Sequence, residues 1–188
     1  MDLEKLRDED RMTERDIVRY LYFHYSSHKA LMPNFTPMNW WECDLLGITR
    51  MGYWREWEVK LSLSDFHADA KKSRGYKNRR NKHEQLAARS TDGPNQFWFV
   101  TPQDLIGTED VPEWAGLLYA SADEDHPIHG WMEEIRPAPR LHGRKAGEEM
   151  NRRIITASIY RYWAERIRCD RLEFETFREN CLETCEGK

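Results

Sequence analysis

The sequence has no long hydrophobic run. No stretch approaches the roughly 18 apolar residues that a membrane-spanning helix needs. The first residues, MDLEK, carry charge, and no apolar stretch follows them, which argues against a signal peptide. We therefore expect a cytoplasmic protein with no membrane partner.

Cysteine and net positive charge are also scarce. The four cysteines form no CxxC pair, which argues against a zinc ribbon and favours free thiols; they are Cys43, Cys169, Cys181 and Cys185. The formal net charge of −4 excludes a chain that is basic throughout, although it leaves room for a local basic face. With 188 residues, of which 39% are hydrophobic, the chain is long enough for a domain with a proper core.

Helix and strand signals alternate along the chain. The segment from Thr13 to Asp16 predicts a helix start, with Thr13 as N-cap and an acid three residues later, and an apolar stripe at helical spacing follows it to Tyr25. Similar signals predict strands over residues 40–49, 53–61, 96–100, 113–120 and 131–135, and helices over residues 62–70, 82–88 and 146–181. This order predicts a mixed α/β domain.

The segment EWEVK, residues 56–60, alternates charged residues with tryptophan and valine and is predicted to pair with the strand before it. Gly52 is suited to the positive φ at the end of a three-residue hairpin loop. A hairpin centred there places Ile48 opposite Trp54 and Asp44 opposite Glu58, and the same register places Glu42 opposite Lys60.

Two carboxylates on directly opposed residues, with Cβ atoms about 4.5–5.5 Å apart, repel each other. A divalent cation offsets that repulsion because hard cations bind carboxylate oxygens. Lys60 lies on the same face of the strand as Glu58, where it could stabilise charge during phosphodiester hydrolysis, while Trp57, Val59 and Leu61 point into the core. The alternative is a solvated edge strand with a cross-strand ion pair, and spacing does not decide between the two.

Asp44 together with Glu58-Val59-Lys60 resembles the core motif of the PD-(D/E)XK, or restriction-endonuclease-like, nucleases, with Cys43 where that motif often has proline. The stretches WEVKLSLSDFHADAKK and QFWFVTP are similar to the small MmcB-like endonucleases of bacteria and phages, which are of the DNA-repair type. The residues that match are Ser62, Asp65, Phe66, Asp69 and Lys71. The resemblance covers roughly residues 13 to 145.

The resemblance implies a central mixed sheet flanked by helices over residues 1–145, with a C-terminal helical extension, 146–188, packed on the same domain. It implies hydrolysis of DNA with Mg²⁺ or Mn²⁺, catalysed by Asp44, Glu58 and Lys60. The metal ligands would be Asp44, Glu58, the backbone carbonyl of Val59, and Glu14 from the first helix; Glu14 could equally be a residue of the capping turn. The first strand of the fold would then lie near residues 34–38, which local signals assign to a loop.

A basic stretch follows the motif directly. Seven cations crowd twelve residues with no acid among them: Lys71, Lys72, Arg74, Lys77, Arg79, Arg80 and Lys82. We expect them to bind the phosphates of DNA, since lysine and arginine neutralise the backbone without reading its sequence. A solvated face on a loop is the alternative.

Two other functions are left open. The same fold could serve as a catalytically silent module that binds nucleic acid or a protein partner. Alternatively, the chain could be a structural protein whose C-terminal helix drives assembly, with the aromatic-rich segment from Ile154 to Trp163 as a homodimer face; that segment could equally dock on the sheet.

Overall fold

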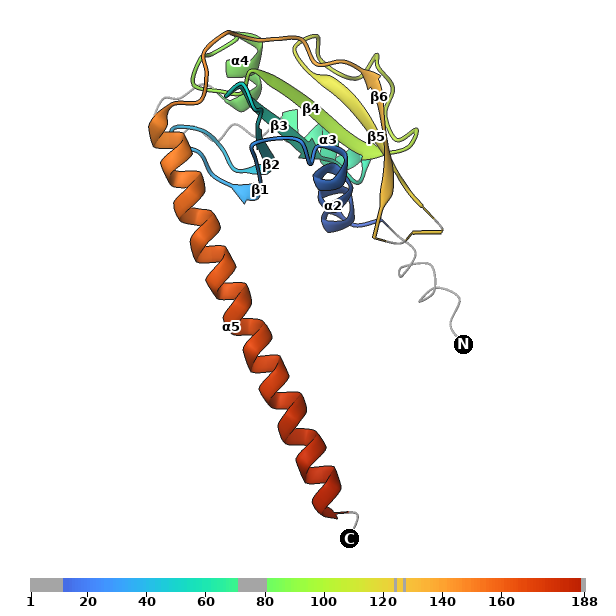
Figure 1. Cartoon of the computed structure of the whole chain (residues 1–188). Helices are drawn as coiled ribbons and strands as arrows, with labels where there is room; N and C mark the ends of the chain where they lie inside the picture. The colour runs from blue at the N-terminus through green and yellow to red at the C-terminus, as the bar shows by residue number, and fades with distance from the viewer. Residues whose placement is uncertain (1–11, 71–80, 124, 127, 187–188) are drawn as a thin grey trace. The chain divides into compact units, whose positions relative to one another are not determined.

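The polypeptide forms a six-stranded mixed sheet, helices that flank the sheet, and a long C-terminal helix (Figure 1). The computed structural model describes residues 12–70, 81–123, 125–126 and 128–186. In chain order the elements are α2 (Glu14–His24), β1 (Ala30–Phe35), β2 (Cys43–Ile48), β3 (Trp54–Val59), α3 (Leu63–Ala70), α4 (Lys82–Ala87), β4 (Gln96–Pro102), β5 (Gly116–Ala122), β6 (Gly130–Arg136) and α5 (Glu148–Glu186). The predicted mixed α/β class is confirmed.

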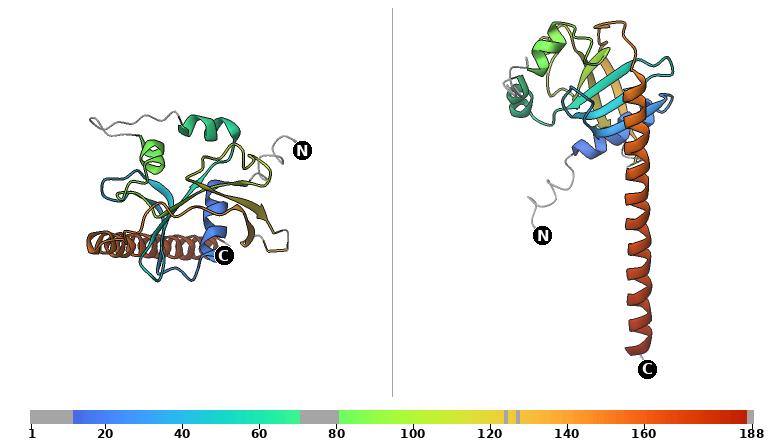
Figure 2. Two further views of the ribbon diagram at one scale, coloured as in Figure 1. Left: turned by 90° about the horizontal axis from the view of Figure 1, so that it is seen from above. Right: turned by 90° about the vertical axis from the view of Figure 1, so that its left-hand side faces the viewer.

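The strands lie in the sheet in the order in which they occur in the chain. Strands β1, β2 and β3 are antiparallel neighbours, β3–β4 and β4–β5 are parallel, and β5–β6 is antiparallel. The parallel step from β3 to β4 needs a crossover, which carries α3 and α4. Seen from above, α3 and α4 lie on one side of the sheet and α2 on the other (Figure 2, left).

Helix α2 begins as its sequence predicts. Thr13 and Asp16 form a reciprocal capping box, in which the Asp16 N–H donates to Thr13 Oγ1 (3.3 Å) and the Thr13 N–H donates to Asp16 Oδ2 (3.0 Å). The apolar stripe then buries Ile17, Tyr20 and Leu21. They join a core layer that includes Leu45, Trp57, Val59 and Trp98 from the sheet.

The β2–β3 hairpin has the predicted register. Ile48 pairs with Trp54 and Leu45 with Trp57, and Gly52 takes the positive φ (+84°) that the loop requires. Positive φ is costly for a residue with a Cβ, which is why glycine suits this position. The register matters because it fixes which side chains of β2 and β3 share a face.

Strand β1 was not placed correctly by the sequence. It starts at Ala30 and ends at Phe35, so it overlaps the segment 34–38 that the resemblance suggested only at residues 34 and 35. Residues 40–42, which we expected in the following strand, lie outside it. Pro33 lies within β1 and pairs with Leu45. Proline is tolerated there because β1 is an edge strand.

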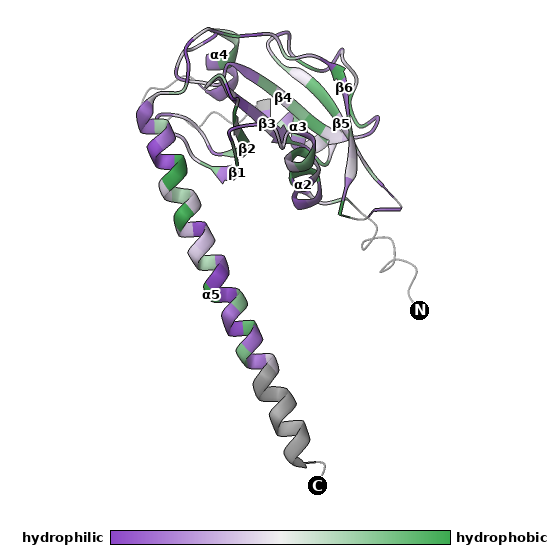
Figure 3. Cartoon of the chain, in the orientation of Figure 1, coloured by the Kyte–Doolittle hydropathy of each residue, from purple (hydrophilic) through white to green (hydrophobic). Residues whose placement is uncertain are grey.

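Helix α5 forms a compact unit of its own from Gly147 onward, separate from the unit that ends at Ala146. It runs for 39 residues and confirms the predicted C-terminal helix. Hydrophobic residues are interspersed among hydrophilic ones along it (Figure 3), and Ile159, Trp163 and Ile167 are each more than half exposed. Its packing on the domain and its use as a homodimer face stay predictions.

None of the helices in the described ranges is both long enough and apolar enough to cross a membrane.

Candidate functional site

The hairpin brings Asp44 to the level of Glu58. The register that pairs Leu45 with Trp57 continues by one residue to this position. The Val59 N–H donates a hydrogen bond of 2.7 Å to Asp44 Oδ2, which ties the start of β2 to the end of β3. Asp44 is half-buried, and Glu58 is 8% exposed. The two carboxylates that the sequence singled out therefore come from adjacent strands and lie close together.

Glu58 is held by two lysines. Lys60 Nζ donates to Glu58 Oε1 (2.9 Å), and Lys82 Nζ donates to Glu58 Oε2 (2.6 Å). Both lysines are buried, with exposed fractions of 3% and 8%. A charge this deep in a protein is tolerated when it is paired and hydrogen-bonded, and each ammonium has at least one carboxylate at contact distance.

Lys82 also neutralises Glu56, the first charged residue of the EWEVK strand. Its Nζ lies 2.7 Å from Glu56 Oε1, while Trp40 Nε1 donates to Glu56 Oε2 at 2.8 Å. Glu56 is fully buried. Lys82 thus bridges two buried carboxylates of β3 from the first residue of α4.

Asp69 of α3 completes the contacts of Lys60. Asp69 Oδ1 lies 3.2 Å from Lys60 Nζ, and Asp69 Oδ2 lies 2.8 Å from His83 Nε2. The ring of His83 in turn packs edge-on against Trp114, with ring centroids 5.2 Å apart. Helices α3 and α4 therefore cover the charged face of β3, and the ammonium of Lys60 is fixed between two carboxylates.

The charges of this site shift several pKa values. Burial, together with the negative charges of Glu58 and Glu14, raises the pKa of Asp44 to about 7, against the opposing effects of the Val59 hydrogen bond and of Lys60. Burial alone would raise the pKa of Glu58, but Lys82 and Lys60 hold it below its ordinary value. The carboxylates overcome the opposite effect of burial on Lys60 and raise its pKa, so Lys60 stays cationic at neutral pH.

These shifts separate Asp44 from the rest of the cluster. Two lysines contact Glu58, whereas Asp44 faces the negative charges of Glu58 and Glu14, opposed by the Val59 N–H and by the charge of Lys60. Its carboxylate therefore favours either a proton or an added cation. Oxygen ligands in a region of excess negative charge match the preference of Mg²⁺ and Mn²⁺.

Asp44 and Glu58, with backbone oxygen and water, therefore fit a hard divalent cation. Within the described ranges, no group of three or more His, Cys, Asp or Glu side chains is arranged to hold a metal ion. Mg²⁺ commonly keeps several waters and takes one or two protein carboxylates together with substrate phosphates, so Asp44 and Glu58 are the residues that could hold it here. Both oxygens of Glu58 accept from lysine, so a cation would share these oxygens with the ammonium groups.

Glu14 lies at the first position of α2, exposed to solvent. The capping box uses Thr13 and Asp16, so Glu14 is not one of its partners. Its negative charge is one of the causes that raise the pKa of Asp44. Glu14 thus belongs electrostatically to the Asp44 site.

The structure gives Lys82 a different place from the one expected. We predicted an exposed cation that binds DNA phosphates, but its ammonium is buried between Glu56 and Glu58. The sequence was misleading because Lys82 ends a basic run and was therefore grouped with it. In the structure Lys82 is instead the first residue of helix α4, which is capped by Asn81. The other six cations, Lys71, Lys72, Arg74, Lys77, Arg79 and Arg80, lie outside the described residues.

Sequence reasoning also missed some members of the cluster. Glu56 shares the alternation of Glu58 and Lys60, so the period-two pattern could have found it. His83 and Trp40 carry no local signal, because tertiary packing alone brings them to Asp69 and Glu56.

No protein-family model matches the chain, and no curated protein matches it either. Among solved structures, the fold is similar to that of a protein of unknown function from Silicibacter pomeroyi, with a TM-score of 0.59 and 18% sequence identity. The match covers 84% of this chain and 93% of that one. At this identity, the likeness shows a shared fold alone.

Proposed function

We propose that the protein is a metal-dependent endonuclease of the PD-(D/E)XK type that hydrolyses phosphodiester bonds in DNA. The observation that carries the proposal is the juxtaposition of Asp44 with the Glu58-Val59-Lys60 segment, joined by the 2.7 Å hydrogen bond from the Val59 N–H to Asp44 Oδ2. Two carboxylates and a lysine on adjacent strands are the groups that this reaction needs in one place.

Asp44 and Glu58 would hold Mg²⁺ or Mn²⁺, with the backbone carbonyl of Val59 and the carboxylate of Glu14 as further ligands. The bound ion would supply polarisation of the phosphoryl oxygen and a lowered pKa for a coordinated water. The cytoplasmic location and the DNA contacts of residues 71–80 belong to the same proposal.

Lys60 has the properties of an electrostatic catalyst rather than of a base. Its pKa is raised by Glu58 and Asp69, so it carries a proton throughout the neutral range. The same two carboxylates fix its position, at 2.9 and 3.2 Å. A fixed cation stabilises charge that develops on a phosphate without having to reorganise during the reaction.

A catalytically silent binding module is the second candidate. The observation that favours it is the engagement of both Glu58 oxygens by lysine. A closed network of ion pairs could be purely structural, and the protein would then bind DNA without cleaving it.

The test is cleavage of plasmid, linear, single-stranded and branched DNA with Mg²⁺ or Mn²⁺, comparing wild type with Asp44→Asn and Lys60→Met. Asp92→Asn is the matched control, because Asp92 is an exposed carboxylate whose partner, Arg144, is exposed as well. Circular dichroism checks that each variant is folded, which matters most for the buried Lys60.

We expect wild type and Asp92→Asn to cleave, and chelator and Asp44→Asn to abolish cleavage without loss of the fold. Cleavage by Asp44→Asn at the wild-type rate would refute the assignment of the site. Salt-sensitive DNA binding without cleavage in either metal would favour the binding module.

A further inference from the structure

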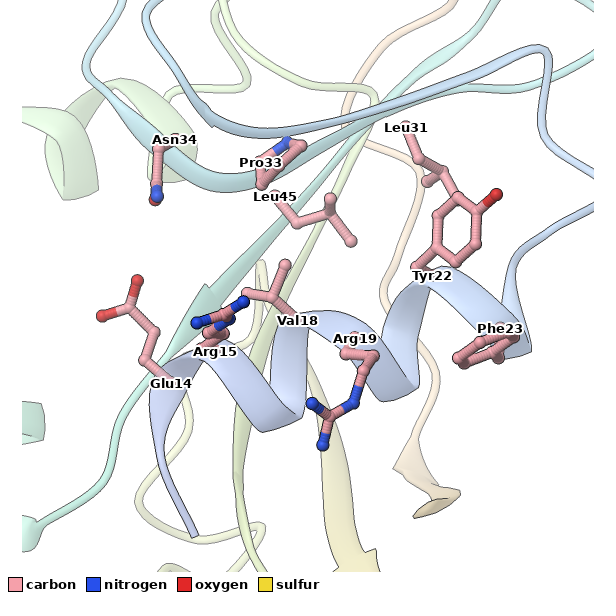
Figure 4. Close-up of a pocket in the computed structure, with 10 residues that line it drawn as sticks. All are labelled: Glu14, Arg15, Val18, Arg19, Tyr22, Phe23, Leu31, Pro33, Asn34 and Leu45. Carbon is pink, nitrogen blue, oxygen red and sulfur yellow. The ribbon is translucent and has the colours of Figure 1, made fainter. Parts of the chain in front are cut away.

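A pocket of about 660 Å³ opens between helix α2 and strands β1 and β2 (Figure 4). Its middle is apolar, formed by Val18 from the helix and by Leu31, Pro33 and Leu45 from the strands. This volume lies within the range of about 300–1,000 Å³ that is typical of small-molecule sites in proteins.

The two ends of the pocket differ in chemistry. Glu14 and Arg15 lie at one end and Tyr22 at the other, one face of α2 joining them (Figure 4). Tyr22 is 54% exposed, so its ring is open to a ligand. One end therefore offers charge and the other an aromatic surface.

Arg15 is the cation at the charged end. Arg19 also lines the pocket, but its guanidinium donates to the Ile128 carbonyl (3.0 Å) and pairs with Asp16 (2.8 Å). Arg15 is exposed and lies beside Glu14. Arginine in such a position is suited to a phosphate, which it can bind through two N–H groups.

The charged end adjoins the candidate catalytic site. The charge of Glu14 contributes to the raised pKa of Asp44, and Leu45, the residue after Asp44, forms part of the pocket wall. Consecutive strand residues point to opposite faces of the sheet, so Leu45 and Asp44 lie on different faces. A ligand must therefore pass around the end of β2 to reach from the pocket to the catalytic site. An extended, flexible molecule with repeating charges can do so.

We propose that this pocket holds an unpaired nucleotide next to the phosphodiester that is cleaved, and that the substrate is therefore single-stranded DNA or DNA with an unpaired end. The inference rests on the proposed function and narrows its substrate. The base lies against Tyr22 and the apolar wall, and the neighbouring phosphate lies at Arg15. A base inside a duplex has both faces stacked, so it must leave the duplex to make this contact.

The pocket also favours tolerance of base sequence. Its wall is mostly apolar, and the uncharged polar groups that line it are Asn34 and the Tyr22 hydroxyl, so it offers few groups that could read the edge of a base. Stacking on an aromatic ring accepts every base, because each base has a π face.

The test is fluorescence anisotropy of a labelled 12-nucleotide oligothymidine and of a 12-base-pair duplex, measured in chelator so that no cleavage occurs. The variants are Tyr22→Ala, Tyr22→Phe and Arg15→Gln. Trp131→Ala is the control, since Trp131 is an aromatic residue on β6 that is 68% exposed and outside the pocket.

We expect wild type to bind the single strand more tightly than the duplex. Tyr22→Ala should raise the Kd for the single strand by about 5- to 150-fold, while Tyr22→Phe and Trp131→Ala leave it within about twofold. Arg15→Gln should reduce the dependence of the Kd on salt.

The outcomes separate this inference from the nuclease proposal. Binding of the single strand that is unaffected by Tyr22→Ala overturns the pocket assignment, even if the protein cleaves DNA. Binding that depends on Tyr22, with no cleavage in Mg²⁺ or Mn²⁺, keeps the pocket and removes the nuclease. Tighter binding of the duplex than of the single strand overturns the substrate assignment.

Discussion

Replacing Lys82 by methionine should destabilise the sheet domain strongly. The substitution keeps the apolar stem of the side chain but removes the ammonium that lies 2.7 Å from Glu56 and 2.6 Å from Glu58. Both carboxylates are buried; Glu58 would keep its contact with Lys60, but Glu56 would be left with an uncompensated charge in a region of low dielectric. Removing one partner of a buried ion pair costs about 3–5 kcal/mol.

Thermal and urea unfolding, followed by circular dichroism, measure the effect. For a domain of this size, a loss of about 3–5 kcal/mol corresponds to a fall in Tm of roughly 6–20 °C. Arg144→Met is the control, because the pair of Arg144 with Asp92 is 3.7 Å long and its side chains are 66% and 61% exposed. Exposed pairs contribute roughly 0–1 kcal/mol, so this variant should unfold close to wild type.

A second substitution identifies the cause of the loss. Lys82→Met combined with Glu56→Gln should recover part of the stability, because the uncompensated charge of Glu56 is gone. Lowering the pH should also narrow the gap between Lys82→Met and wild type, as Glu56 and Glu58 take up protons. If Lys82→Met unfolds as Arg144→Met does, the buried bridge contributes little and the reasoning fails.

Three other substitutions test individual contacts of the sheet domain. Because the folded pKa of Asp44, about 7, lies above its ordinary 3.8, the contribution of the Asp44 carboxyl to stability falls as pH rises from about 4 to 7. In chelator, Asp44→Asn should therefore gain stability relative to wild type between about pH 4 and about pH 8, and a difference in stability that is the same at both pH values would contradict this. Asn95→Ala should cost about 1–3 kcal/mol in urea unfolding, because the Trp54 N–H loses its 2.7 Å acceptor, and an unchanged midpoint would refute the point. Trp40→Phe should cost about 1.5–3 kcal/mol through the lost hydrogen bond to Glu56 Oε2, less at low pH, where a neutral Glu56 depends on it less.

Local sequence patterns were sufficient to predict most of the helices and strands. The capping residues Thr13 and Asp16 placed the start of α2, and Gly52 placed the hairpin and with it the Ile48–Trp54 register. Strand β1 was missed because the prolines and asparagines of residues 33–39 read as a loop. What permits Pro33 is the position of the strand at the edge of the sheet, which is a property of the whole topology.

The candidate site was predictable only in part. Asp44 and Glu58 could be brought together from the sequence because hairpin pairing is local. The contacts of Lys82 with Glu56 and of Asp69 with Lys60 depend on how α3 and α4 pack over the sheet. Such packing has no period in the sequence, so a basic residue beside a basic run was assigned to solvent.

The alternation of charge and aromatic surface along β3 also limits how the strand can pair during folding. A slip of one residue would turn Glu56 and Glu58 toward the layer of Trp98 and would expose Trp57 to the lysines. Trp57 adds a steric constraint, since a Cβ on Gly47 would lie 2.6 Å from its ring. Mispaired hairpins are thus disfavoured by electrostatics on one face, where α4 supplies Lys82, and by shape on the other.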